Sequence, residues 1–203
     1  MFKVVLEGCV VNGLVELLGQ VISDYISRDA EEEYVRVAYT GPSILVFLED
    51  EYVELVRGAE YTLPRWAAQI LVDRGYVKIL EESVDAVSIS RLLFNESRSR
   101  GLVKFEKLKG YFYIRVKNTI SHLLKQYKSA GNIEEIKKIS DTLTALTSNT
   151  RGLYKVRLGK MLSLLSVQEL PPEVLSNLSE EEKHLYNAVR TLLEILNKRV
   201  FEV

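Results

Sequence analysis

The chain has 203 residues, of which 47% are apolar and 27% are charged, and its formal net charge at pH 7 is −1. A chain of this length and composition can bury a core in one domain or in two small ones. A net charge near zero excludes an assignment of partners from global charge, but residues 1–96 carry 8 Lys or Arg and 17 Asp or Glu, whereas residues 97–203 carry 19 and 11. This asymmetry favours two halves that face different partners, or each other in an assembly; two solvated surfaces would give the same pattern.

The single cysteine, Cys9, excludes an internal disulfide and is typical of a protein from a reducing, intracellular environment. No signal peptide is visible. Glu7, Glu16 and Asp24 interrupt the apolar residues 4–26, and a membrane span tolerates such charges poorly. We therefore expect a cytoplasmic protein that makes no membrane contact.

The N-terminal residues predict one strand and one helix. Residues 2–11 are apolar and rich in β-branched side chains, which favours a strand. Residues 14–27 place apolar side chains at helical spacing. The acidic residues 29–33 predict a solvated loop. Residues 1–33 are expected either to extend the domain that follows or to dock on another subunit.

Three strands are expected next, over residues 34–40, 44–48 and 52–56. Gly41 and Pro42 mark the first turn, and an acidic segment marks the second. Connections this short imply a small antiparallel meander.

A short helix follows the meander. Thr62 suits its N-cap region, and Pro64 suits its first turn, where the missing N–H costs nothing. Trp66, the only tryptophan, shares an apolar face with Ile70 and Leu71, which predicts that it anchors the core.

Gly75 stands where a left-handed residue would end this helix. Residues 76–80 then predict a strand that returns to the sheet. The sequence thus favours a small β-rich domain over residues 1–82, with an antiparallel meander and one packed helix, and a polar link begins the second domain at residue 83.

The second domain, residues 83–203, predicts a bundle of about five helices, which makes the fold class α+β. Asn132 with Glu135 and Ser179 with Glu182 have capping-box spacing, and Pro171 begins a Pro-Pro break. The helices are expected over residues 87–97, 105–127, 132–146, 153–167 and 179–200.

Residues that could form a catalytic, metal or cofactor site are scarce. His122 and His184 have no His or Cys at ligand spacing, and Gly8 and Gly13 lack the pattern of a phosphate-binding loop. No acid, base and nucleophile can be combined into a catalytic set. We expect a protein that is not an enzyme and has no cofactor.

Two basic groups are candidate contacts with a partner or with DNA. Residues 98–128 carry nine Lys or Arg with interleaved aromatic side chains, a pattern that can bind single-stranded nucleic acid. A solvated basic surface over an aromatic core, with Phe112 and Val116 facing inward, explains the same pattern. The candidate contact residues of both groups are Arg98, Arg100, Lys104, Lys107, Lys109, Arg151, Lys155, Arg157 and Lys160.

Five segments together resemble the GINS family of replication proteins. YTLPRWAAQILVDRGYVKI, residues 61–79, resembles the small domain of GINS subunits, and the residues from Ile89 to Glu96 resemble the linker helix that follows it. KLKGYFY, residues 107–113, is similar to the entry to the first long helix of the family. LYKVRLGKMLSLL, residues 153–165, resembles its R-x-x-K helix with Arg157 and Lys160 at the matching positions, and LSEEEKHLY, residues 178–186, resembles the start of a late helix.

The order of the two domains resembles that of archaeal subunits in which the small domain comes first. The resemblance implies a non-enzymatic scaffold of a hetero-tetramer with a paralogous GINS subunit, associated with the nucleoid. It also implies that the chain helps to bridge and activate the Mcm helicase with a RecJ-like protein, with primase as a further partner and only indirect DNA contact. The alternative is a nucleic-acid-binding module that uses the basic residues 98–128.

Overall fold

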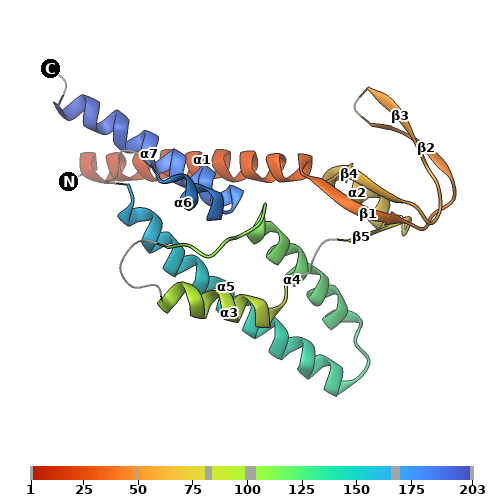
Figure 1. Ribbon diagram of the computed structural model, residues 1–203. Coiled ribbons are helices and arrows are strands. Elements are labelled where there is room, and N and C mark those ends of the chain that lie inside the picture. Colours follow the sequence, from red (N-terminus) through yellow and green to blue (C-terminus); the bar gives the residue numbers. More distant parts are fainter. Residues whose placement is uncertain (1, 49, 81–83, 99–103, 166–169, 202–203) are drawn as a thin grey trace. The chain divides into compact units, whose positions relative to one another are not determined.

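The computed structural model describes residues 2–48, 50–80, 84–98, 104–165 and 170–201 (Figure 1). The chain divides into two compact units, Met1–Glu82 and Ser83–Val203. The first contains antiparallel sheets with two helices, and the second contains helices, so the fold class is α+β.

The first unit begins with a long helix, α1 (Phe2–Glu32). The predicted strand over residues 2–11 and the predicted loop over residues 29–33 are therefore wrong. A strand must pair with a neighbour, whereas a helix satisfies its backbone groups locally, and this difference outweighs the β propensity of the valines. Ala30 near the helix end is buried. This small apolar residue among the acids holds the segment against the protein interior, whereas the acidic composition had suggested a solvated loop.

The sheets of the first unit are antiparallel throughout. β1 (Tyr34–Tyr39) is the central strand of a three-stranded sheet, with β4 (Glu60–Pro64) on one side and β5 (Val77–Ile79) on the other. β2 (Ile44–Leu48) and β3 (Glu51–Leu55) form a separate hairpin. The strand order is thus not sequential, and β4 was not predicted because Thr62 and Pro64 resembled a helix start.

The helix α2 (Arg65–Asp73) begins after Pro64, which is both the last residue of β4 and the N-cap. Its end at Gly75 is confirmed, since Gly75 has a φ of 72°. The Gly75 N–H donates to the Val72 carbonyl at 2.9 Å, and the Tyr76 N–H donates to the Leu71 carbonyl at 2.9 Å. These two bonds form a Schellman motif, which satisfies carbonyls at the helix end.

The prediction that Trp66 anchors the core is wrong, because Trp66 is 43% exposed. The apolar residues of the buried face of α2 are Ala67, Ala68 and Leu71, whereas Trp66 and Ile70 lie together on the opposite side. The small alanines allow α2 to lie close to the sheet. Because this face packs inward, Trp66 and Ile70 are left exposed to solvent.

The second unit contains five helices among the residues described, α3 to α7. α3 (Ala86–Arg98) agrees with prediction, but α4 (Phe112–Ser129) starts later, because residues 104–111 are not helical and Gly110 has a φ of 50°. Two predicted helices are one, α5 (Ile133–Ser163). The unit ends with α6 (Pro172–Asn177) and α7 (Glu180–Phe201).

The continuity of α5 has a packing cause at Gly152. A Cβ at this glycine would lie 3.1 Å from Leu93 Cδ2, so the glycine allows α3 to approach α5 closely instead of ending a helix. Around it, Ile89, Phe112 and Leu153 belong to one buried cluster, which confirms the inward position of Phe112. A second cluster surrounds the C-terminal end of α5 and includes Met161.

Candidate functional site

Charged and polar side chains from four segments meet inside the second unit. Glu96 comes from α3, Tyr113 from α4, Arg157 and Lys160 from α5, and Glu182 from α7. We call these five residues the buried ion cluster. Residues from four segments that are far apart in the sequence therefore share one three-dimensional contact.

Arg157 is the centre of this cluster and is fully buried. Its Nε and Nη2 donate to the two carboxylate oxygens of Glu182 at 2.7 and 2.6 Å. Its Nη1 donates to Glu96 Oε2 at 3.2 Å. The remaining donors reach the backbone carbonyls of Glu106 at 2.9 Å and Asn177 at 3.1 Å. All five guanidinium N–H groups therefore have an acceptor, which is the condition for burying this side chain at low cost.

Lys160 and Ser179 complete the coordination of the two carboxylates. Lys160 Nζ donates to Glu96 Oε1 at 2.9 Å and to the carbonyls of Glu96 and Lys104 at 2.9 and 2.8 Å. Glu182 Oε2 accepts the Ser179 N–H at 3.0 Å, and Ser179 Oγ accepts the Glu182 N–H at 3.4 Å. The predicted capping box is thus confirmed, and its glutamate also neutralises Arg157.

The electrostatics of the cluster favour the charged form of Arg157 and the protonated form of Tyr113. Burial opposes the charge of Arg157, but its hydrogen bonds to Glu182 and the charges of Glu182 and Glu96 outweigh burial and raise its pKa. Burial and the neighbouring Glu182 carboxylate raise the pKa of Tyr113, whose hydroxyl donates to Glu182 Oε1 at 2.8 Å. Two cations thus face two carboxylates, and each side chain in the cluster is already bonded within the unit.

Arg157 and Lys160 were predicted to contact a partner or DNA, and the structure corrects both assignments. The side chain of Arg157 has no exposed surface, and that of Lys160 is 15% exposed with its ammonium group bonded internally. Both also lie over the Phe105 ring, at 5.0 and 5.6 Å from its centroid. Their helix face points inward, because Leu153, Arg157 and Met161 follow each other one turn apart.

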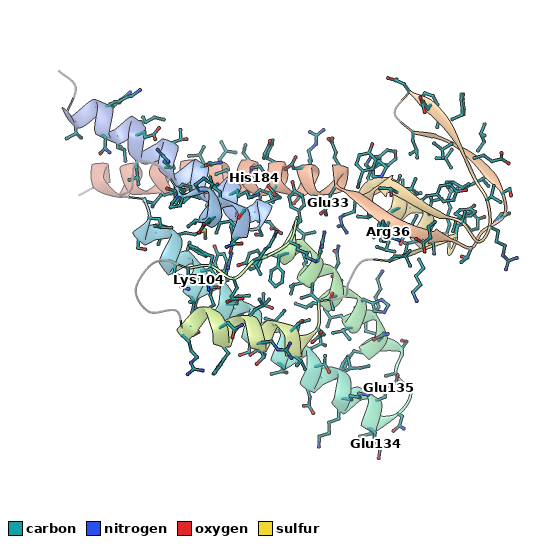
Figure 2. The ribbon with its side chains drawn as sticks, in the orientation of Figure 1. Glu33, Arg36, Lys104, Glu134, Glu135 and His184 are labelled. Atoms are coloured by element: carbon teal, nitrogen blue, oxygen red, sulfur yellow. The ribbon has the colours of Figure 1, made fainter. Side chains whose placement is uncertain are left out.

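The other predicted cations differ in their surroundings. Arg151 and Lys155 are exposed on one face of α5. Lys107 and Lys109, in the segment before α4, are exposed as well. Arg100 lies outside the described residues. Figure 2 shows Lys104 in the segment between α3 and α4, away from Glu134 and Glu135 at the start of α5.

The aromatic side chains of the first basic group are mostly core residues. Phe105, Tyr111 and Phe112 are buried, and Tyr127 near the end of α4 is exposed. An exposed ring does stand beside this group, however. Phe94 on α3 is 57% exposed, and the Arg98 guanidinium lies 4.9 Å from its centroid. Phe94, Arg98 and Lys104 line one open cavity of about 450 Å³.

Large apolar side chains are exposed along the last turns of α7. Every residue from 191 to 200 is exposed, including five large apolar ones: Leu192, Leu193, Ile195, Leu196 and Val200. Leu192, Leu196 and Val200 recur at helical spacing and form one stripe. A small apolar cavity between α5 and α7, lined by Leu162 and Val189, lies next to the start of this stripe. A surface of this kind is typical of a protein–protein interface.

Glu181 links the N-termini of α4 and α7. Its Oε1 accepts the Ile114 N–H at 3.1 Å, which caps a helix whose own N-cap residue, Tyr111, provides no side-chain acceptor. Its Oε2 is buried without a hydrogen-bond partner among the described residues. Burial raises the pKa of this carboxyl, although backbone N–H groups, first that of Ile114, act in the opposite direction.

The described part of the chain contains no group of three His, Cys, Asp or Glu residues placed to hold a metal ion. None of its helices is long and apolar enough to cross a membrane. His122 on α4 is exposed and lies 3.1 Å from Gln126, and His184 is on α7 (Figure 2).

The ion cluster was missed in the sequence, although two signals pointed to it. Glu96 stands two turns after Ile89 on the inward face of α3, and Arg157 stands one turn after Leu153 on the inward face of α5. A charge at an apolar position of a helix predicts a buried partner of opposite charge. Neither a protein-family model nor a curated protein matches this sequence.

Proposed function

We propose that the chain is a non-enzymatic scaffold subunit of a GINS-like DNA replication complex. In this role it joins a paralogous subunit in a hetero-oligomer and helps to bridge and activate the Mcm helicase with a RecJ-like protein. The proposal rests first on the buried ion cluster, because residues of four separate motif-like segments depend on each other there. Such mutual dependence is what a shared helical fold requires of its motif residues.

The exposed apolar stripe of α7 supports the assembly part of the proposal. Leu192, Leu196 and Val200 are 49%, 58% and 68% exposed, and a paralogous helix packed on them would remove this surface from water. The exposed cations Arg151 and Lys155 on α5 would then contribute to partner choice and to association rate more than to affinity.

The test is purification of the tagged chain from its native cells after mild crosslinking, with identification of the proteins that accompany it. The proposal expects a paralogous subunit in a fixed ratio, together with Mcm and RecJ-like proteins. A variant with Leu192→Gln and Leu196→Gln should lose the paralogue, whereas Ile133→Gln, at an 82% exposed position on α5, should retain it. Recovery of the chain without any replication protein would contradict the proposal.

A nucleic-acid-binding module is the second candidate, favoured by the exposed Phe94 ring between the cations Arg98 and Lys104. A base could stack on the ring while the cations contact phosphates. This function expects binding to single-stranded DNA that weakens steeply with salt and is lost in Phe94→Ala. Absence of binding to single-stranded DNA at low salt, or equal binding by the Phe94→Ala variant, would contradict this second function.

A further inference from the structure

The β2–β3 hairpin of the first unit presents an apolar face to solvent. Phe47 on β2 pairs with Tyr52 on β3, and Leu45 pairs with Glu54, so these four side chains share one face. The Phe47 and Tyr52 rings lie 4.9 Å apart. Tyr52 is 70% exposed and Leu45 is 64% exposed, and Figure 1 shows the hairpin projecting from the three-stranded sheet.

The opposite face of the hairpin is anchored to the core of this unit. Leu48 and Leu55 are buried members of the core cluster, and Val46 and Val53 pack against it. Tyr61 on β4 adds a polar link, because its hydroxyl accepts the Val56 N–H at 2.8 Å and donates to the Glu54 carbonyl at 3.1 Å. The exposed face is therefore held in place before any partner arrives, which lowers the entropy lost on binding.

The charged residues within the hairpin are all of one sign. The sequence from residue 44 to residue 56 contains four acids and no Lys or Arg. In the described part of the hairpin Asp50, Glu51 and Glu54 are exposed, and the structure pairs none of them with a described cation. The hairpin thus combines an exposed aromatic pair with uncompensated negative charge.

A cavity of about 320 Å³ opens at the turn end of the hairpin, on the face that carries Leu48 and Val53 and thus opposite to Phe47 and Tyr52. Tyr34, Tyr61 and Pro64 form part of its wall, and Asp50 and Glu51 contribute carboxylates to it. Aromatic and apolar walls suit the aliphatic stem of a long side chain, and carboxylates suit a cationic head. The lining therefore fits an arginine or lysine side chain.

We propose that the β2–β3 hairpin and this cavity form a docking site for a basic segment of a partner protein. An arginine or lysine of the segment enters the cavity toward Asp50 and Glu51, and an apolar residue farther along the segment packs on Phe47 and Tyr52, on the opposite face of the hairpin. The site is separate from the stripe on α7 and does not depend on the replication role. Nucleic acid is disfavoured here because its phosphates would meet the same carboxylates.

The test measures binding of three synthetic peptides of equal length to the full chain by calorimetry and by amide chemical shifts. One peptide alternates arginine with leucine, one arginine with serine, and one glutamate with leucine. The site expects the first to bind in a salt-dependent manner, with shifts confined to residues 44–64. The other two should bind at least roughly tenfold more weakly, because each lacks one of the two required features.

Two double variants, each with a matched control, assign the contacts. Asp50→Asn with Glu51→Gln, and Phe47→Thr with Tyr52→Thr, should each weaken binding by roughly tenfold or more. Glu31→Gln with Glu32→Gln makes the same change of charge at exposed positions of α1, and Trp66→Gln with Ile70→Gln removes exposed apolar surface from α2. Neither control should change the binding.

The proposal would be overturned by absence of binding, by equal binding of the arginine–serine peptide, by shifts outside the hairpin and cavity, or by equal losses in the controls. If the amide chemical shifts of the hairpin change with protein concentration in the absence of peptide, the occupant of the site is a second copy of the chain. Stronger binding of single-stranded DNA than of the peptide to this face would also overturn the proposal.

Discussion

Arg157 and Glu182 are joined by two hydrogen bonds of 2.7 and 2.6 Å, although 25 residues separate them in the sequence and their side chains are 0% and 1% exposed. The pair connects α5 to the first turn of α7, and Glu96 connects α3 to the same guanidinium at 3.2 Å. The relative positions of three helices therefore depend on one buried cation.

Replacement of Arg157 by methionine should destabilise the second unit by about 3–5 kcal/mol, because two carboxylates would remain buried without their partner. Arg157→Lys should also destabilise it, since one ammonium group cannot replace five donors in a planar arrangement. Urea unfolding monitored by circular dichroism measures both. Arg151→Met, at an exposed position on the same helix, should change the free energy of unfolding by less than about 0.5 kcal/mol. A loss below about 1 kcal/mol in Arg157→Met would contradict the structural role of the cluster.

Glu181 should make the stability of the second unit fall as pH rises. Burial raises its folded pKa above the ordinary 4.5, so the folded state holds the proton more tightly than the unfolded chain. Its favourable contribution is then complete below about pH 4.5 and is lost as pH rises through the raised pKa.

Glu181→Gln should remove this dependence while keeping an oxygen that can accept the Ile114 N–H. The difference in free energy of unfolding between variant and parent should therefore become more positive from pH 4.5 toward neutrality. Glu180→Gln, one residue earlier and partly exposed in an ion pair with Lys183, is the control. Parallel stability profiles for Glu181→Gln and the parent would refute the assignment.

Gly41→Ala should destabilise the first unit through a steric clash. A Cβ at Gly41 would lie 2.8 Å from both Tyr39 Oη and Tyr76 Cγ, and Tyr39 is itself buried. Overpacking of this kind costs about 1–3 kcal/mol. Gly13→Ala is the opposite case, because no atom lies within 4 Å of its added Cβ and α1 is helical there. It should stabilise the helix by roughly 0.5–1 kcal/mol, and thermal unfolding of both variants would separate the two effects.

The stripe on α7 should control self-association of the isolated chain. Leu192→Gln with Leu196→Gln keeps helix propensity nearly unchanged but removes two large apolar side chains from the surface. We expect the parent to sediment increasingly as oligomers when its concentration rises, and the double variant to remain closer to a monomer. Ile133→Gln with Leu124→Gln, exposed elsewhere in the second unit, serves as the control. A parent chain that stays monomeric at high concentration would contradict the interface.

Local signals predicted the fold best. Gly75 and the Ser179–Glu182 capping box were identified correctly because their geometry depends on neighbours within a few residues. The strands β1, β2, β3 and β5 followed from short apolar or alternating runs between turn signals, which are local as well. The boundaries of α4 and α5 failed, since Gly152 serves a contact with α3 that the local sequence does not contain.

The candidate site was less predictable than the fold. Arg157 and Lys160 looked like surface cations because their acceptors, Glu96 and Glu182, are distant in the sequence. Trp66 looked like a core residue because size favours burial, whereas the sheet accepts Ala67 and Ala68 at close approach. In each case the outcome depended on which helix face met a partner, and that choice is made by tertiary packing.

The buried ion cluster also constrains how this sequence can evolve. Loss of Arg157 alone leaves two carboxylates buried without this cation, and loss of Glu96 or Glu182 alone leaves Arg157 with only one of its two carboxylate partners. Each single substitution lowers the stability of the second unit. Related sequences should therefore either keep the residues at positions 96, 157 and 182 as a set or replace all three with apolar residues. Covariation among these three positions is the mark that the cluster would leave in a lineage.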